Sequence, residues 1–274
     1  MAEAFLEAGY TVYGYDPVTA AAQRLKRAGG KPLASATEVA ERADVLITSL
    51  ASSAALRDAV RGISRASRRK RVVIEMSTLP IADKERARRD LARVEIVALD
   101  CPVSGTAVRL KQRTWTIFMS GDKRACNRAE GMLRVLADNV PYVGAYGNGT
   151  KMKFIANHLV AILNVASAEA LVFGRRMGLD ARRVLEIFGP SPVVGTGVFR
   201  LRGELMAKRR YKPPTMKIAV WQKDMRIIGQ MARAVGAATP LFRASAPVFT
   251  AALKQGYGDA DTASVFEVLE RSSS

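Results

Sequence analysis

The first half of the chain alternates short strand-like segments with longer helix-like segments. Strands that alternate with helical patterns of roughly 10–15 residues are typical of βαβ units and of a mostly parallel sheet. Strand-like segments are expected at residues 10–16, 44–50, 71–77, 95–100, 115–121 and 140–144. Helix-like segments are expected between them, at residues 18–29, 37–43, 54–63, 81–94 and 123–139. This alternation predicts an α/β domain.

The second half has a different pattern, with no convincing strand after residue 146. From Met152 to Phe173 the chain is apolar on nearly all sides, which predicts a long buried helix. Further helices are expected at residues 179–189, 215–236, 240–256 and 261–271. We therefore predict a Rossmann-like nucleotide-binding domain at residues 1–145 and an all-α domain at residues 146–274, entered through the long helix.

The opening segment, MAEAFLEAGYTVYGYDP, has the pattern of the second half of a nucleotide-binding βαβ unit. A complete unit has an earlier strand and a glycine-rich turn whose N–H groups bind the pyrophosphate. The first expected strand ends at Asp16. An acidic residue at this position accepts hydrogen bonds from the ribose and favours NAD over NADP, which makes Asp16 a candidate cofactor contact. Judged locally, Asp16 before Pro17 also fits an ordinary turn.

Composition limits the other classes of function. The net charge is +18, but the densest basic cluster, residues 61–71, contains no aromatic residue and directly precedes an apolar strand. A solvated connection explains this cluster better than a nucleic-acid surface does. The two cysteines, Cys101 and Cys126, lack metal-ligand spacing, so we expect a reducing, cytoplasmic compartment and no metal. No uninterrupted apolar run approaches the roughly 18 residues of a membrane span, and no signal peptide is expected.

Two loops follow expected strands and carry small polar residues. Ligands bind beyond the carboxyl ends of the strands in a doubly wound sheet. Ser77 and Thr78 follow one strand, where they are placed to contact a flat cofactor ring, to cap the next helix, or to do both. Ser104, Gly105 and Thr106 follow another strand, where a hydroxyl and backbone N–H groups would bind a carboxylate, although an ordinary turn explains the same residues.

The segment GNGTKMKFIANH gives the strongest chemical signal. Lys153 and Asn157 are four residues apart and share one helix face. A lysine among apolar residues loses solvation, which lowers its pKa and suits it to proton transfer. Lys151 is an alternative amine on a different face, and a lysine whose stem lies along apolar surface is the structural alternative. We expect His158 to serve in packing or in a local hydrogen bond.

A second charged pair, Lys223 and Asp224, lies inside an otherwise apolar helix. The two residues either form part of a site, or they form a local ion pair or are simply exposed to solvent.

Because these motifs follow one another in a fixed order along the sequence, the chain resembles the β-hydroxyacid dehydrogenase family, the 3-hydroxyisobutyrate dehydrogenase-like enzymes. The resemblance covers nearly the whole chain and rests on the segments MAEAFLEAGYTVYGYD, ADVLITSL, IEMSTLP, DCPVSGT, GNGTKMKFIAN and WQKDM. It implies a Rossmann domain followed by a helical substrate and dimerisation domain, and a homodimer or homotetramer. The implied reaction is oxidation of a small β-hydroxy acid by NAD(P), or the reverse reduction.

The resemblance also implies roles for individual residues. Lys153 matches the catalytic lysine, which takes the hydroxyl proton while hydride passes to the nicotinamide. Asn157 matches its partner, and Ser104, Gly105 and Thr106 match the loop that binds the substrate carboxylate. The remaining matches are to cofactor contacts, at Leu50, Ala51, Thr78 and Lys223.

The sequence departs from the family pattern at several positions. Thr106 replaces a second glycine, Ala51 replaces a proline, and Ala156 replaces the first of two asparagines. Residues 108–111 are bulky and basic where the family has small residues, which favours a larger or more acidic substrate.

The start of the chain is the largest departure. Met1-Ala2 matches a pair inside the family's first helix, so the first strand and the GxGxMG turn have no counterpart. We expect an open reading frame that starts roughly 15–25 residues earlier, since a strand, a turn and a helix start need that many. The alternatives are a non-catalytic or weakly cofactor-binding homologue and an imine reductase-like enzyme of the same fold. Lys153 argues against the imine reductases, which lack this lysine.

Overall fold

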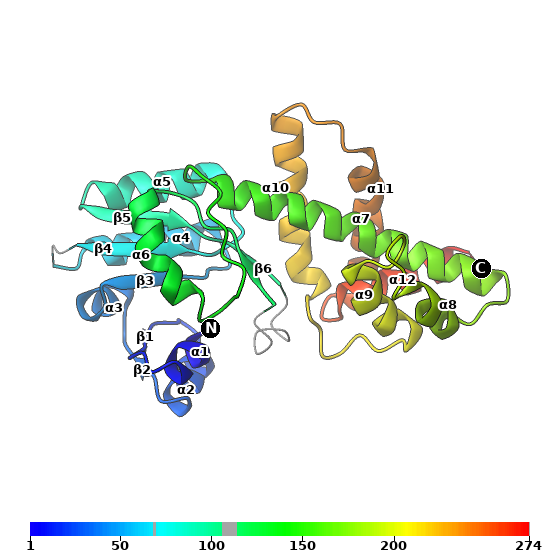
Figure 1. The fold of residues 1–274 in the computed structure, drawn as a ribbon, viewed down its shortest axis with the longest axis horizontal. Helices are drawn as coiled ribbons and strands as arrows, with labels where there is room; N and C mark the ends of the chain where they lie inside the picture. Colours follow the sequence, from blue (N-terminus) through cyan, green and yellow to red (C-terminus); the bar gives the residue numbers. More distant parts are fainter. Residues whose placement is uncertain (68–69, 106–113, 274) are drawn as a thin grey trace. The chain divides into compact units, whose positions relative to one another are not determined.

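The computed structural model describes residues 1–67, 70–105 and 114–273. The chain forms two compact units, Met1–Lys153 and Phe154–Ser274, and each is described by itself (Figure 1). The division lies inside one long helix, α7 (Asn148–Arg176), so the last residues of the first unit and the first residues of the second share an unbroken helix.

The first unit is built on a parallel three-stranded sheet in the order β3-β4-β5. The strands are β3 (Val45–Thr48), β4 (Arg71–Glu75) and β5 (Ile96–Asp100), with Ile74 of β4 in register with Ile47 and Leu99. A parallel pair and an antiparallel pair accompany the sheet, formed by β1 (Tyr13–Gly14) with β2 (Lys31–Pro32) and by β6 (Val103–Ser104) with β7 (Thr116–Ile117).

Helices follow the strands along the first unit, as the alternating pattern predicts. They are α1 (Ala2–Glu7), α2 (Thr19–Arg27), α3 (Ala36–Arg42), α4 (Ser53–Ser64), α5 (Ile81–Ala92) and α6 (Lys123–Leu133). Side chains of Ser35, Ser52 and Asp122 cap α3, α4 and α6 by accepting a hydrogen bond from the N–H three residues later.

Each face of the three-stranded sheet has its own apolar core, because side chains alternate across a strand. In β4, Val73 packs into the core that holds α3, α4 and α5, whereas Ile74 packs into the core that holds α1 and α6. In β5, Ala98 and Leu99 divide in the same way. Helices on both faces of a parallel sheet make this unit a Rossmann-like α/β domain, which confirms the predicted fold class.

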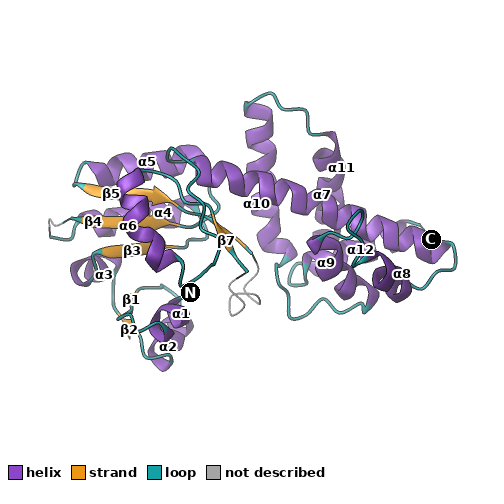
Figure 2. Cartoon of the chain, in the orientation of Figure 1, coloured by secondary structure: helices purple, strands orange, loops and turns teal. Residues whose placement is uncertain are grey.

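The second unit is helical (Figure 2). After α7 it contains α8 (Ala181–Phe188), α9 (Gly197–Ala207), α10 (Ile218–Ala234), α11 (Pro240–Ala252), the π-helical turn η2 (Leu253–Tyr257), the 3-10 turn η3 (Thr262–Ser264) and α12 (Val265–Ser272). Buried aromatic rings fill its core, and the rings of Trp221 and Phe249 lie 6.0 Å apart. The predicted all-α second domain is therefore confirmed.

A buried ion pair joins α9 to the segment before α12. Arg202 is bonded to Asp261, whose carboxylate also accepts hydrogen bonds from the N–H and hydroxyl of Thr215. Burial lowers the pKa of the Arg202 guanidinium, and Asp261 opposes that shift. Removing one partner of such a pair is costly, because the other charge stays buried without compensation.

Three details differ from the sequence-based expectations. The segment expected as a strand at residues 140–144 is not a regular strand, but it pairs in parallel with Met119 through a bridge to Tyr142, a hydrogen bond from the N–H of Met119 to Pro141 and one from the N–H of Val143 to Met119. Helix α9 was not predicted, since Gly197 and Gly203 weaken its helical pattern. Helix α7 was expected to be buried all round, but Ile155, at 57% exposure, belongs to a face that the single chain leaves uncovered.

Among the described residues, α7 alone is long and apolar enough to cross a membrane by length and composition, and 44% of its most apolar window is buried in the chain. The core helix of a water-soluble protein passes the same test. The division of roles between residues 1–145 and 146–274 stays a prediction.

Both cysteines should resist thiol reagents in the folded protein. Burial raises the pKa of Cys101 and raises that of Cys126 to about 11, so little thiolate forms at pH 8. We expect almost no reaction with a chromogenic disulfide over minutes in native buffer, and two thiols per chain in guanidinium. Rapid native labelling of either cysteine would contradict this burial.

Candidate functional site

Three of the predicted contact segments follow the three parallel strands. Leu50 and Ala51 follow β3, Thr78 follows β4, and Ser104 follows β5. Because neighbouring parallel strands end at the same edge of a sheet, these segments lie along one edge of the first unit. This is the edge at which doubly wound sheets bind ligands.

The loops after β3 and β4 are joined by side-chain hydrogen bonds. The N–H of Leu50 donates to Ser77 Oγ over 2.7 Å, and the N–H of Ser77 donates to Glu75 Oε1 over 2.9 Å. Helix α5 begins after Pro80, and this N-cap residue makes no side-chain cap bond, while capping by Thr78 stays a prediction. The hydroxyl of Ser77 fixes the loop that carries Leu50.

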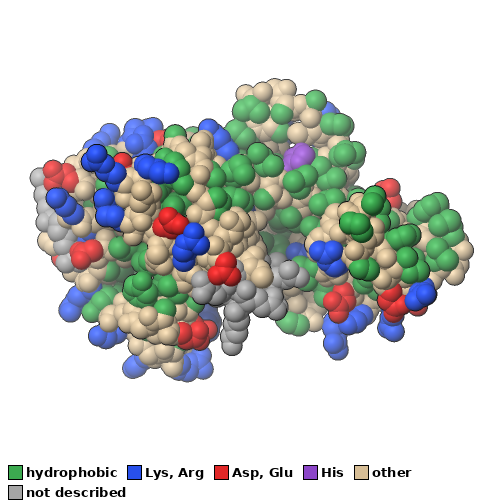
Figure 3. All heavy atoms as spheres, in the orientation of Figure 1, with side chains coloured by type: hydrophobic (Ala, Val, Ile, Leu, Met, Phe, Trp, Pro, Cys, Tyr) green, Lys and Arg blue, Asp and Glu red, His purple; other side chains and the backbone are tan. Residues whose placement is uncertain are grey.

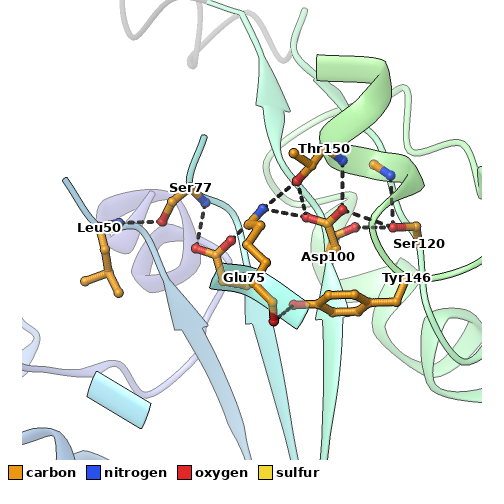
Figure 4. A network of polar contacts seen from close by, with 9 residues as sticks. Leu50, Glu75, Ser77, Asp100, Ser120, Tyr146 and Thr150 are labelled. Atoms are coloured by element: carbon orange, nitrogen blue, oxygen red, sulfur yellow. Dashed lines mark hydrogen bonds and ion pairs between the residues drawn. The ribbon is translucent and has the colours of Figure 1, made fainter. Parts of the chain in front are cut away.

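A fully buried lysine contacts the carboxylates of Glu75 and Asp100, which end β4 and β5 and are labelled in Figure 4. Lys84 Nζ, from α5, is 2.6 Å from Glu75 Oε2 and 2.5 Å from Asp100 Oδ1, and it donates to Thr150 Oγ1 over 2.8 Å. Burial alone would lower the pKa of Lys84, but the two carboxylates outweigh burial and raise it. The ammonium therefore stays charged and uses its three protons within this cluster.

Asp100 connects this cluster to the start of α7. Its Oδ2 accepts a hydrogen bond from the N–H of Thr150 over 2.7 Å, and its Oδ1 accepts one from the Thr150 hydroxyl over 2.7 Å. The N–H of Gly149 donates to Ser120 Oγ over 3.0 Å. A carboxylate at a helix N-terminus bonds the N–H groups that lack partners in the helix and offsets the helix dipole.

Gly149 allows the close approach of α7 to the sheet. A Cβ atom at this position would lie 2.4 Å from the carbonyl oxygen of Phe118 and 2.6 Å from that of Asp100. Both obstacles are backbone atoms, which cannot rotate away. The first turn of α7 is thereby fixed against the end of β5. Lys153, the predicted catalytic residue, is half-buried one helical turn further along.

Ser104 and Gly105 lie in and directly after β6, where Gly105 has a φ of +153°. A Cβ atom at Gly105 would lie 2.2 Å from the ring of Trp115, so the close approach here is to an aromatic ring. Thr106 and residues 108–111 lie outside the described residues. The carboxylate-binding role of this loop stays a prediction.

Asp16 is exposed after β1, and its Oδ1 accepts a hydrogen bond from the N–H of Val18 over 2.8 Å. This is the turn geometry that the sequence suggested as the structural alternative. A carboxylate has a second oxygen and further lone pairs, so the turn is compatible with a ribose contact. The ribose contact itself stays a prediction.

In the second unit, Asn157 and Asp224 form a buried pair. Asn157 Nδ2 donates to Asp224 Oδ2 over 3.0 Å, which joins α7 to α10. Lys223 Nζ lies 3.3 Å from Asp224 Oδ1, so the expected local ion pair is present. The ring of His158 is stacked on Phe242, with centroids 5.0 Å apart, in agreement with the expected packing role.

The two units divide the predicted site residues between them. Most of these residues, including Lys153, belong to the first unit, whereas Asn157 and Lys223 belong to the second. No cluster of three or more potential metal ligands is found among residues 1–67, 70–105 and 114–273.

Sequence reasoning missed the buried charge cluster of Glu75, Lys84 and Asp100. A signal was present, since Lys84, Ala87 and Leu91 have the spacing of one buried face of α5. Glu75 also stands inside an apolar strand pattern.

Two known families match the chain, and the boundary between their matches lies close to the boundary between the two compact units. Residues 1–144 match the family described as the NAD binding domain of 6-phosphogluconate dehydrogenase. Residues 147–269 match the family described as NAD-binding of NADP-dependent 3-hydroxyisobutyrate dehydrogenase.

Individual relatives match almost the whole chain. L-threonate dehydrogenase of Cupriavidus necator is 31% identical, over 98% of this chain and 91% of the relative. The 2-hydroxy-3-oxopropionate reductase of Escherichia coli is 26% identical, over 91% and 86%.

Solved structures show the same arrangement of elements. The 3-hydroxyisobutyrate dehydrogenase of Salmonella typhimurium has a TM-score of 0.87 at 27% identity, over 97% of this chain and 94% of that chain. An imine reductase from Pseudomonas sp. has a TM-score of 0.61 at 20% identity, over 98% and 94%, which shows similarity of fold alone.

The Asn157–Asp224 pair gives a pH-dependent test. In Asn157→Asp two buried carboxylates meet, which raises the pKa of the pair and lowers the free energy of unfolding at pH 7 by about 2 kcal/mol or more. Protonation removes the repulsion, so the loss should shrink as the pH falls toward 5. Urea titrations measure both values.

The matched control is Asn157→Ala, which removes the hydrogen bond without adding charge. Its loss of stability should change less between pH 7 and pH 5 than that of Asn157→Asp, because no second carboxylate faces Asp224. Equal pH dependence of the two variants would contradict the contact between residues 157 and 224.

Proposed function

Because the chain belongs to the β-hydroxyacid dehydrogenase family, we propose that it interconverts a small β-hydroxy acid and its oxo acid or semialdehyde, with Lys153 as the proton-transfer residue. Family membership makes it an NAD(P)-dependent oxidoreductase. The observation that carries the assignment of Lys153 is the anchored start of α7. Asp100 binds the first turn of that helix at the ligand-binding edge of the sheet, and Lys153 follows one turn later.

The proposed chemistry requires a group that takes the hydroxyl proton of the substrate during oxidation. The neutral amine of Lys153 does this and returns the proton in the reverse direction. NAD(P), when bound, accepts or supplies the hydride. Of this chain's residues, Asp16 would hold the ribose, and Leu50, Ala51 and Thr78 would line the cofactor. Lys223 is a further proposed contact.

The residues present fit such a cofactor on two points. The carboxylate of Asp16 is exposed after β1, where it is open to ribose hydroxyls. The loop of Leu50, a proposed cofactor contact, is held by a hydrogen bond to Ser77, and this supports the proposal. Asp16 supports a preference for NAD over NADP, because a carboxylate repels a 2′-phosphate.

For the substrate we propose a small carboxylate, with Ser104, Gly105, Thr106 and Asn157 as its proposed contacts. The net charge of +18 favours an anionic ligand. The relative that acts on L-threonate supports a polyhydroxy acid as one candidate, and 3-hydroxyisobutyrate is another.

We propose that the protein is a homodimer or homotetramer. An exposed apolar stripe on α7 is formed by Ile155, Leu159, Ala166, Ala170 and Phe173. These positions fall within about 60° of one another at 3.6 residues per turn, so they form one narrow face. Hydrophobic side chains are visible at the surface of the second unit in Figure 3. Such a stripe is typical of a surface that packs against another chain.

We further propose that α7 is a core and interface helix rather than a membrane span. The buried face of α7 carries the polar side chains of Asn157 and Asn164, both in the second unit. A cytoplasmic location is supported by the free cysteines Cys101 and Cys126, which fit a reducing compartment.

Lys153→Ala tests the assigned base. The variant should lose at least a hundredfold in kcat for oxidation of L-threonate or 3-hydroxyisobutyrate, because general base catalysis contributes roughly 10²–10⁴-fold. The control is Lys151→Ala, which removes an exposed amine two residues away and should keep kcat within threefold. A large loss in the control, or none in Lys153→Ala, would exclude the assignment.

Asp16→Ser tests the cofactor preference. Removing the carboxylate should lower kcat/KM for NAD and raise it for NADP, which shifts their ratio at least tenfold toward NADP. Steady-state kinetics with both cofactors measure the ratio. Because Ser is also able to accept the turn hydrogen bond of Val18, the fold should be preserved. An unchanged ratio would remove Asp16 from the proposed cofactor site.

A further inference from the structure

The buried polar network of the first unit extends further than its ion pairs. Hydrogen bonds and ion pairs join six residues into what we call the Lys84 network: Leu50, Ser77, Glu75, Lys84, Asp100 and Thr150. Each link between neighbours in this order is 2.9 Å or shorter. One end is the loop after β3, and the other end is the first turn of α7 (Figure 4).

The charges in the network do not cancel by themselves. One ammonium, on Lys84, faces two carboxylates, on Glu75 and Asp100, and all three side chains are at most 2% exposed. The excess negative charge lies at the start of α7, where the helix dipole contributes about half a positive charge. The helix start thus offsets about half of the excess negative charge of the cluster, and the cluster in turn fixes the position of the helix start.

Thr150 is the residue through which the cluster holds the helix. Its hydroxyl accepts a hydrogen bond from Lys84 Nζ over 2.8 Å and donates one to Asp100 Oδ1 over 2.7 Å. Both capacities of the hydroxyl are therefore used, and the side chain is fully buried. Serine can make the same two bonds, whereas valine, of similar shape, makes neither.

We propose that Thr150 is a positioning residue, which holds the α7 turn that carries Lys153 at a fixed place relative to the loops after β3 and β4. This inference rests on the proposed function, in which Lys153 moves the proton and those loops line the cofactor. Thr150 touches neither substrate nor cofactor in this role. It acts by restricting the amine of Lys153 to one position relative to the reacting carbon.

The test uses Thr150→Val, Thr150→Ser and a matched control, Thr48→Val. Thr48 is also buried, on β3, and its hydroxyl has no hydrogen-bond partner among the residues that the structure describes, so the same substitution there removes no described hydrogen bond. Each full-length variant is assayed well below its melting temperature, with L-threonate and 3-hydroxyisobutyrate as substrates and NAD and NADP as cofactors. Hydrogen exchange of the backbone amides at residues 151–154 is measured on the same samples.

Thr150→Val should lower kcat about tenfold relative to Thr48→Val, while the KM for the cofactor stays within twofold. Thr150→Ser should restore kcat to within threefold of the unmodified protein. Exchange at residues 151–154 should be at least fivefold faster in Thr150→Val than in Thr48→Val. A purely structural role would lower the melting temperature without this separation of kcat from KM.

Two results overturn the proposal: a kcat of Thr150→Val within twofold of the control, or a kcat of Thr150→Ser as low as that of Thr150→Val. If Thr150→Val does not fold, Ser120→Ala replaces it, since this variant removes the bond to the N–H of Gly149. A kcat of Ser120→Ala at least threefold below the control supports the proposal, and a smaller loss overturns it.

Failure of the proposed function is recognised separately. If the unmodified protein turns over neither substrate with either cofactor, that result counts against the proposed reaction and leaves the exchange measurement to decide the role of Thr150. The proposal for Thr150 would then be overturned if hydrogen exchange at residues 151–154 were equally fast in Thr150→Val and in the control Thr48→Val. Where Ser120→Ala replaces Thr150→Val, the same comparison with Thr48→Val applies.

Discussion

The ammonium of Lys84 is the group on which the first unit depends. It comes from α5 and lies between the ends of two neighbouring strands, where it holds Glu75 and Asp100 at ion-pair distance. Removing charged groups from water costs several kcal/mol per ion, and only close partners on every side recover that cost. The cluster therefore tolerates one arrangement of α5, β4, β5 and the start of α7, and few others. A packed apolar core would restrict these elements less strictly.

Much of the fold is predictable from the sequence, because its signals are local. The alternation of Val73 and Ile74 between two cores follows from the two-residue period of a strand, and the end of α10 before Gly236 follows from helix-stop rules. The segment expected as a strand at residues 140–144 is not a regular strand, because its pairing with residues 117–121 is limited to one parallel bridge and a few backbone hydrogen bonds. Local β-propensity is similar for β4 and for residues 140–144, and only the tertiary contacts of each segment decide whether it becomes a regular strand.

The candidate site was predictable only in part. Lys153 and Asn157 are recognisable because they share a helix face within a few residues. Lys84 and Thr150 were not recognised, since they are 66 residues apart and their contact depends on the packing of α5 against the sheet. Although Lys84 has the spacing of a buried face, the many charged residues of α5 give the helix the composition of a solvated one, and nothing in α5 itself shows that a carboxylate lies opposite. The pairing of Asn157 with Asp224 was missed for the same reason.

The unbroken course of α7 has a consequence for length variation in this chain. Lys153 belongs to the first unit and Asn157 to the second, and no loop separates them. Each added or deleted residue in a helix turns the following part by about 100° and shifts it by about 1.5 Å. A single insertion between these positions would therefore move Asn157 to a different face from Lys153. Insertions are tolerable in the surface loops of either unit, but not in this four-residue interval.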